Sequence, residues 1–132
     1  FYFWWLKNTS KTLWGDDVLG RLNIDMKKKD WRENVVFQRG VALSAMISFR
    51  NGDTETAEWG FSKSCLFATV SGLALKGKVV ASFKEASGLA VKEFPDFENV
   101  IRKAKAVWQG KAYIEEADIF NNFEYLFFLG QL

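Results

Sequence analysis

Apolar and small side chains alternate in the nine residues VALSAMISF, at positions 41–49. One set consists of Val41, Leu43, Ala45, Ile47 and Phe49, and the other of Ala42, Ser44, Met46 and Ser48. Because successive side chains of a strand point to opposite faces, this period of two predicts a half-buried β-strand. The hairpin signal Asn51-Gly52-Asp53 follows it, so we expect residues 54–61 to return as a second strand and residues 65–70 to add a third.

The next segment, SGLALKGKVV at positions 71–80, matches all but the last position of the phosphate-binding pattern G-x-x-x-x-G-K-[ST]. That last position holds Val79, which has no hydroxyl to bind Mg²⁺. The residues between the two glycines alternate like those of a strand. We therefore expect a turn at 76–78 followed by another strand at 79–83, and we do not expect a nucleotide to bind.

A helix is predicted over about residues 96–109. Its apolar side chains recur with a helical period and form one stripe: Phe97, Val100, Ile101, Ala104, Val107 and Trp108. Asp96 is expected to cap its start and Gly110 to close its end. The predicted fold class is α+β, with an antiparallel β-sheet over about residues 35–92 packed against this helix. We expect one domain, 1–132, with an N-terminal aromatic segment 1–6 and a C-terminal acidic and aromatic tail 112–132.

Two absences limit the chemistry of the chain. It has no histidine and a single cysteine, Cys65, in an apolar stretch where it is expected to be buried. Histidine- and cysteine-based metal sites and catalytic triads are thereby excluded, and we expect neither metal nor cofactor. The net charge of only +2 gives no reason to expect nucleic acid as a partner.

Any catalysis would depend on carboxylates. Three acidic clusters are candidates, namely Asp16 with Asp17, Asp53 with Glu55 and Glu58, and Glu115 with Glu116 and Asp118. Two carboxylates at the right separation hydrolyse glycosides, so a carboxylate-dependent hydrolase stays open as one alternative.

Aromatic residues make up 17% of the chain, and five of them open it: Phe1, Tyr2, Phe3, Trp4 and Trp5. Each ring has roughly 150–250 Å² to bury, and a strand through them would be aromatic on both faces. They either fold back into the core as an edge strand or contact a partner protein or a membrane surface, and we predict the second. The apolar run at 124–129 suits a buried strand or a docking tail. We predict that its rings also contact a partner: Tyr125, Phe127 and Phe128.

Charge is distributed unevenly. Residues 63–111 carry nine Lys or Arg against four Asp or Glu, whereas residues 112–132 carry four acids and no Lys or Arg. Either the acidic tail packs near the basic helix, or the two segments are partner-facing patches of opposite sign. A further basic patch surrounds one tryptophan: Lys27, Lys28, Lys29, Trp31 and Arg32. It is either a solvated loop or a contact for phosphate or lipid headgroups.

The segment GFSKSCLFATVS, at positions 60–71, resembles a segment of the lipid-binding SYLF domains, without the glycine found there. The likeness covers about a dozen residues, so no function is carried over from it, and lipid only stays open as one ligand class. Because the chain begins at Phe1 and not at Met, a processed precursor, secreted or organellar, is one expectation for its origin.

Taken together, these features predict a non-catalytic interaction module, such as an accessory subunit of a larger, membrane-associated assembly, which docks through exposed aromatic residues. A lipid or small apolar ligand-binding domain is the first alternative, and the carboxylate-dependent hydrolase is the second.

Overall fold

The structure, a computed structural model, describes residues 1–11 and 15–132. Those residues form helices joined by short connections: α1 (Tyr2–Thr9), α2 (Val18–Arg21), α3 (Lys28–Arg50), α4 (Thr54–Leu75), α5 (Phe83–Glu93), the 3₁₀ turn η1 (Pro95–Phe97), α6 (Glu98–Trp108) and α7 (Glu116–Leu129). No strand occurs in them. The fold class is therefore all-α, and the predicted α+β fold is wrong.

The antiparallel sheet expected over about residues 35–92 is replaced by α3, α4 and most of α5. The alternation at 41–49 misled the prediction because α3 is apolar on two sides. Ala42 and Ala45 face the core, whereas Leu43 and Ile47 are about half exposed on the outside. Two apolar faces on one helix leave few polar positions between them, so the pattern resembles that of a strand.

The turn at Asn51-Gly52-Asp53 exists, but it joins two helices and not two strands. Gly52 has φ +79°, a left-handed conformation that glycine adopts without steric cost. Asp53 then caps α4, because its carboxylate accepts a hydrogen bond from the backbone N–H of Thr56 at 3.2 Å. Hydrogen bonding from the Thr56 side chain, together with this backbone bond, lowers the pKa of Asp53. The turn at 76–78 is likewise present, at the end of α4.

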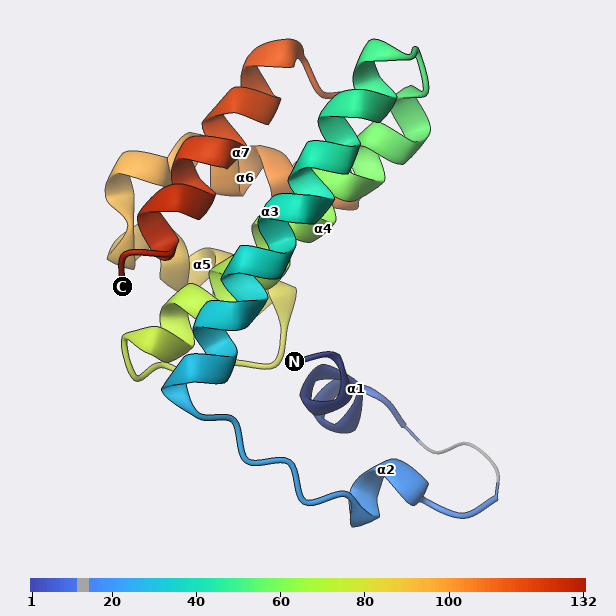
Figure 1. Cartoon of the computed structure of the whole chain (residues 1–132), viewed down its shortest axis with the longest axis vertical. Helices are drawn as coiled ribbons and strands as arrows, with labels where there is room; N and C mark the ends of the chain where they lie inside the picture. The colour runs from blue at the N-terminus through green and yellow to red at the C-terminus, as the bar shows by residue number, and fades with distance from the viewer. Residues whose placement is uncertain (12–14) are drawn as a thin grey trace.

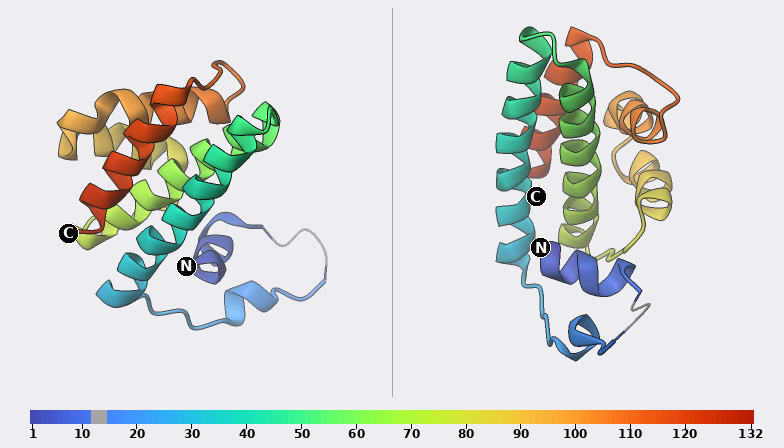
Figure 2. Two further views of the ribbon diagram at one scale, coloured as in Figure 1. Left: turned by 45° about the horizontal axis from the view of Figure 1, so that its top comes forward. Right: turned by 90° about the vertical axis from the view of Figure 1, so that its right-hand side faces the viewer.

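Helix α4 is the centre of the molecule. Figure 2 shows it between α3 on one side and α5 and α6 on the other, while α7 packs against both α3 and α4. Almost every residue from Gly60 to Leu73 is buried, including Phe61, Cys65 and Val70 at 0% exposure. Each large apolar side chain enclosed in this way contributes about 1.5–3 kcal/mol to stability.

Polar side chains inside the core pair across helix contacts. The Nδ2 of Asn34 in α3 donates to Oγ of Ser71 at 2.8 Å, and Asn122 in α7 donates to Oγ of Ser64 at 2.8 Å. Because an unpaired buried polar group costs free energy, these bonds fix the positions of α3 and α7 along α4. Gly72, the first glycine of the phosphate-loop-like pattern, lies within α4 against Leu129, so the pattern does not form a phosphate-binding loop.

The helix predicted over about 96–109 is confirmed as η1 and α6, and its stripe faces inward at Val100, Ile101, Ala104 and Val107. Gly110 follows it with φ +71°, as expected. The cap is different, because Pro95 opens a 3₁₀ turn and Asp96 makes no capping hydrogen bond.

Both ends of the chain are helical, not strands. α1 lies beside the lower half of α3 (Figure 1), where its tryptophans contact Trp31 of α3 and Phe67 of α4. α7 contains the 124–129 run that was expected to form a strand or a tail.

Candidate interaction surface

Most of the N-terminal aromatic side chains pack against the chain itself. Trp4 is buried against Trp31, with ring centroids 4.8 Å apart. Phe67 of α4 contacts the rings of Phe1 and Trp5, and its ring centroid lies 5.2 Å from each of theirs. Such edge-to-face pairs stabilise by about 0.5–1.5 kcal/mol each beyond the area that they bury. Most of this segment therefore folds back onto the core, although as a docked helix and not as an edge strand.

Tyr2 and Phe3 lie at the margin of this cluster. The hydroxyl of Tyr2 accepts a hydrogen bond from Nε2 of the buried Gln38 at 3.2 Å, and its ring lies 5.9 Å from that of Phe37. Nζ of Lys63 lies 5.1 Å from the centre of the Tyr2 ring. Phe3 alone among the five opening rings is mostly exposed, at 68%. Of the predicted N-terminal contact residues, Phe3 is the one that a partner reaches most directly.

The basic patch lacks an exposed aromatic ring. Trp31 is only 5% exposed, which leaves the neighbouring cations without a ring at the surface. Lys27 and Lys28 are exposed. Nζ of Lys29 lies 3.5 Å from the carboxylate of Glu33, and the guanidinium of Arg32 donates a hydrogen bond to the backbone carbonyl of Leu132. The combination of a cation and a stackable ring, which motivated a nucleic-acid or headgroup contact here, is therefore absent from this patch.

The C-terminal rings divide in the same way. Tyr125 is fully buried, so it is not a surface residue. Phe128 is half-buried against Phe97, with ring centroids 4.9 Å apart. Phe127 is 54% exposed, and the guanidinium of Arg39 lies 4.4 Å from the centre of its ring.

The acidic residues of α7 pair with neighbouring helices. The carboxylate of Asp118 lies 3.3 Å from Nζ of Lys103 in α6, and the carboxylate of Glu116 lies 3.9 Å from the guanidinium of Arg50 in α3. These contacts support the intramolecular explanation of the uneven charge. Among the residues that the structure describes, no three acidic, cysteine or histidine side chains come together as a metal site.

Burial and ion pairing account for the pKa shifts in the core and at its edge. Burial raises the pKa of the Cys65 thiol to about 12 and that of Tyr125 well above its usual value. Hydrogen bonds from Lys78 and Lys76 hold the pKa of Glu93 below its usual value. Because its pKa is so high and it is enclosed in the core, the Cys65 thiol is not a nucleophile at neutral pH.

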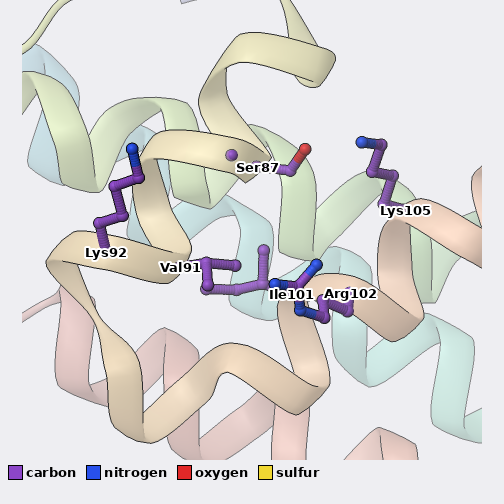
Figure 3. A pocket seen from close by; sticks show the side chains of 7 residues that line it. Ser87, Val91, Lys92, Ile101, Arg102 and Lys105 are labelled. Carbon is purple, nitrogen blue, oxygen red and sulfur yellow. The ribbon is translucent and has the colours of Figure 1, made fainter.

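Figure 3 shows the hollow of about 140 Å³ between α5 and α6. Ser87, Arg102 and the ammonium-bearing side chains of Lys92 and Lys105 line it. Lys92 and Lys105 extend from opposite sides of the hollow (Figure 3), so their charges do not converge on one anion.

A second hollow, of about 310 Å³, lies between α4 and α6. Two half-exposed tryptophans, Trp59 and Trp108, line it together with Glu55 and Glu58. Indole faces beside carboxylates suit a cation, and Nζ of Lys63 already lies 4.2 Å from the centre of the Trp59 ring. The hollow is open to solvent.

A further exposed apolar feature lies on α3, and interpreting residues 41–49 as a strand concealed it. Val36, Leu43 and Ile47 are 56%, 47% and 53% exposed, and Phe37 beside them is 56% exposed. We call these four residues, together with Gly40, the α3 outer face. Their spacing of four, three and four residues places Val36, Gly40, Leu43 and Ile47 in one line along the helix. Figure 2 shows α3 at the edge of the molecule, with no described element on its outer side.

Gly40 sits in the middle of this face without an intramolecular reason. A Cβ placed on it would meet nothing within 4 Å, and its backbone is helical. Glycine inside a helix destabilises it by roughly 0.5–1 kcal/mol relative to alanine. This glycine keeps the surface open at the centre of the face.

Comparison with family models, with curated proteins and with solved structures finds no match to this chain. The short resemblance of residues 60–71 to SYLF domains is therefore unsupported, and the segment forms the buried middle of α4. No described helix combines the length and the apolar character needed to cross a bilayer.

Proposed function

We propose that this chain is a non-catalytic protein-interaction module, in which a helical bundle presents the α3 outer face to a protein partner. The observation that carries the proposal is the alignment of half-exposed Val36, Leu43 and Ile47, with Phe37 beside them, on the longest of the described helices. Isolated exposed apolar residues are ordinary, but a continuous apolar stripe is typical of an interaction site.

The inner side of the same helix satisfies the needs of the fold. Trp31, Val35, Ala42 and Ala45 are buried there, and Asn34 and Gln38 make hydrogen bonds inside the protein. The outer apolar residues are therefore additional to the core. Covering their exposed halves would gain about 1 kcal/mol for each side chain, half of the value for complete burial.

A lipid or small-ligand site is less well supported. One hollow with a partly apolar rim lies beside α1, has a volume of about 470 Å³ and is lined by Phe1, Phe3, Leu22 and Ile24 with Asn23 and Asp25. It is open to solvent, whereas pockets for small ligands bury most of the ligand surface. A helix face whose apolar residues recur every three and four positions is suited instead to another helix.

Site-specific photo-cross-linking tests the proposal. A benzophenone amino acid replaces Leu43 in one variant and the exposed Lys84 of α5 in the control, and both are irradiated in the cells that make the protein. We expect a discrete protein adduct from position 43, to a copy of the chain or to another protein, and none from position 84. The Leu43→Glu exchange should weaken any adduct formed from a second probe at Val36. Identical results from positions 43 and 84 would overturn the proposal.

A further inference from the structure

We infer that the partner of the α3 outer face is a second copy of this chain, packed antiparallel to the first about a two-fold axis. This inference rests on the proposed function and names its partner. The axis crosses α3 between the levels of residues 41 and 42.

The outer stripe has the period of a helix-packing seam. It extends in both directions to charged residues, so that six positions follow one another in steps of three and four: Glu33, Val36, Gly40, Leu43, Ile47 and Arg50. Steps of three and four are the a and d positions of a heptad, which form the seam between two packed helices. α3 therefore carries a seam on the side against which no described helix packs.

The charges at the two ends of the stripe favour antiparallel packing. When two α3 helices lie antiparallel with this axis, residue 33 of each copy faces residue 50 of the other. Glu33 then meets Arg50 at both ends of the seam, whereas parallel packing would place Glu33 on Glu33 and Arg50 on Arg50. Opposite charges at the flanks of a helix seam set its orientation.

Both charged residues are available for this contact. Their side chains are each 63% exposed. Each forms an ion pair within the chain: the carboxylate of Glu33 lies 3.5 Å from Nζ of Lys29, and the guanidinium of Arg50 lies 3.9 Å from the carboxylate of Glu116. Exposed pairs of this kind contribute little to stability, so they exchange partners readily.

The shape of the stripe is complementary to itself in this arrangement. The same axis places Leu43 of one copy opposite Gly40 of the other, and Val36 opposite Ile47. At Gly40 the space above the helix is empty, since a Cβ there would meet no atom within 4 Å. A leucine side chain fits into the depression that a glycine leaves, and the arrangement occurs twice in the dimer. The self-complementary order of charge, bulk and gap is what a two-fold interface requires.

Charge reversal with rescue by mixing tests the inference. The purified chain, of 15.1 kDa, is followed by sedimentation equilibrium from about 1 μM to about 1 mM. We expect its apparent mass to rise toward twice the monomer value with concentration. Glu33→Arg and Arg50→Glu should each weaken self-association at least about tenfold, because each creates two like-charge contacts.

Mixing the two variants decides the orientation. In a mixed dimer the introduced Arg at 33 faces the introduced Glu at 50, and the native Arg50 faces the native Glu33, so an equimolar mixture should associate again. The double variant carrying both reversals should associate on its own. Glu55→Arg and Lys84→Glu make the same changes of charge away from α3 and should leave the dimer intact, and circular dichroism confirms that each variant is folded.

The outcomes separate the two proposals. A chain that stays monomeric throughout, or a dimer that neither reversal weakens, would overturn the inference of self-association. Weakening without recovery on mixing would overturn the antiparallel register. An adduct from position 43 to a different protein, together with a monomeric purified chain, would leave the proposed function standing and remove only the second copy as the partner.

Discussion

Thr69 and Tyr125 form a buried pair whose two partners should respond unequally to substitution. The Thr69 hydroxyl donates to the backbone carbonyl of Cys65 at 2.7 Å, so its only proton is already used. The hydroxyl of Tyr125, 3.0 Å away, is therefore the donor of the contact between them. Burial keeps the pKa of Tyr125 above its usual value, so the phenol remains protonated at neutral pH.

The expected changes in unfolding free energy follow from this direction. Tyr125→Phe removes one hydrogen bond and strands no donor, which costs about 1 kcal/mol. Thr69→Val keeps the shape but leaves the fully buried Tyr125 hydroxyl without an acceptor, at a cost of about 2 kcal/mol. In the double variant no stranded hydroxyl remains, so adding Tyr125→Phe to Thr69→Val should restore about 1 kcal/mol.

Urea unfolding followed by circular dichroism measures these differences. With a slope of about 1–3 kcal/mol per M, Thr69→Val should lower the midpoint by about 1 M. Tyr113→Phe is the matched control, because Tyr113 is 83% exposed and should not shift the midpoint. A double variant less stable than Thr69→Val alone would refute the assigned direction of the hydrogen bond.

Two further predictions concern the core and the docking of α1. The folded state holds the Cys65 proton to about pH 12, whereas the unfolded thiol titrates near 9.0, so unfolding free energy should fall as pH rises from about 9. Urea midpoints at pH 8 and pH 10.5 should therefore differ more in the parent chain than in Cys65→Ala, and equal differences would contradict this. Trp4→Ala should release α1, because truncating a buried tryptophan costs about 3–5 kcal/mol. Hydrogen exchange of α1 should then accelerate in Trp4→Ala but not in Phe3→Ala, and equal protection in both would exclude this role for Trp4.

The sequence predicted helices well where one side of them is polar. α6 was found because its apolar residues form a single stripe from Val100 to Val107, with charged residues on the opposite side. α4 was missed because nearly all its sides are enclosed, so small polar residues such as Ser64 and Ser71 lie inside the core and interrupt no apolar face. A helix buried all round has little amphipathic periodicity to detect.

The same physics explains what the sequence could and could not reveal of the candidate surface. The opening rings were recognised from composition, but their burial depends on Phe67 and Trp31, which only folding brings near them. The stripe from Glu33 to Arg50 is readable in the sequence once residues 28–50 are known to be helical. Interpreted as a strand, the same residues fall on alternate faces and the stripe disappears.

The central position of α4 has a consequence for how the chain is made. Its buried surface is completed by α7, and Leu129 covers Gly72 from a position 57 residues later in the chain. During synthesis the α3–α4 hairpin therefore leaves the ribosome with the apolar side of α4 that faces α7 still exposed. That side is buried only after α7 has been made. In that interval the exposed apolar surface is open to aggregation and to binding by chaperones.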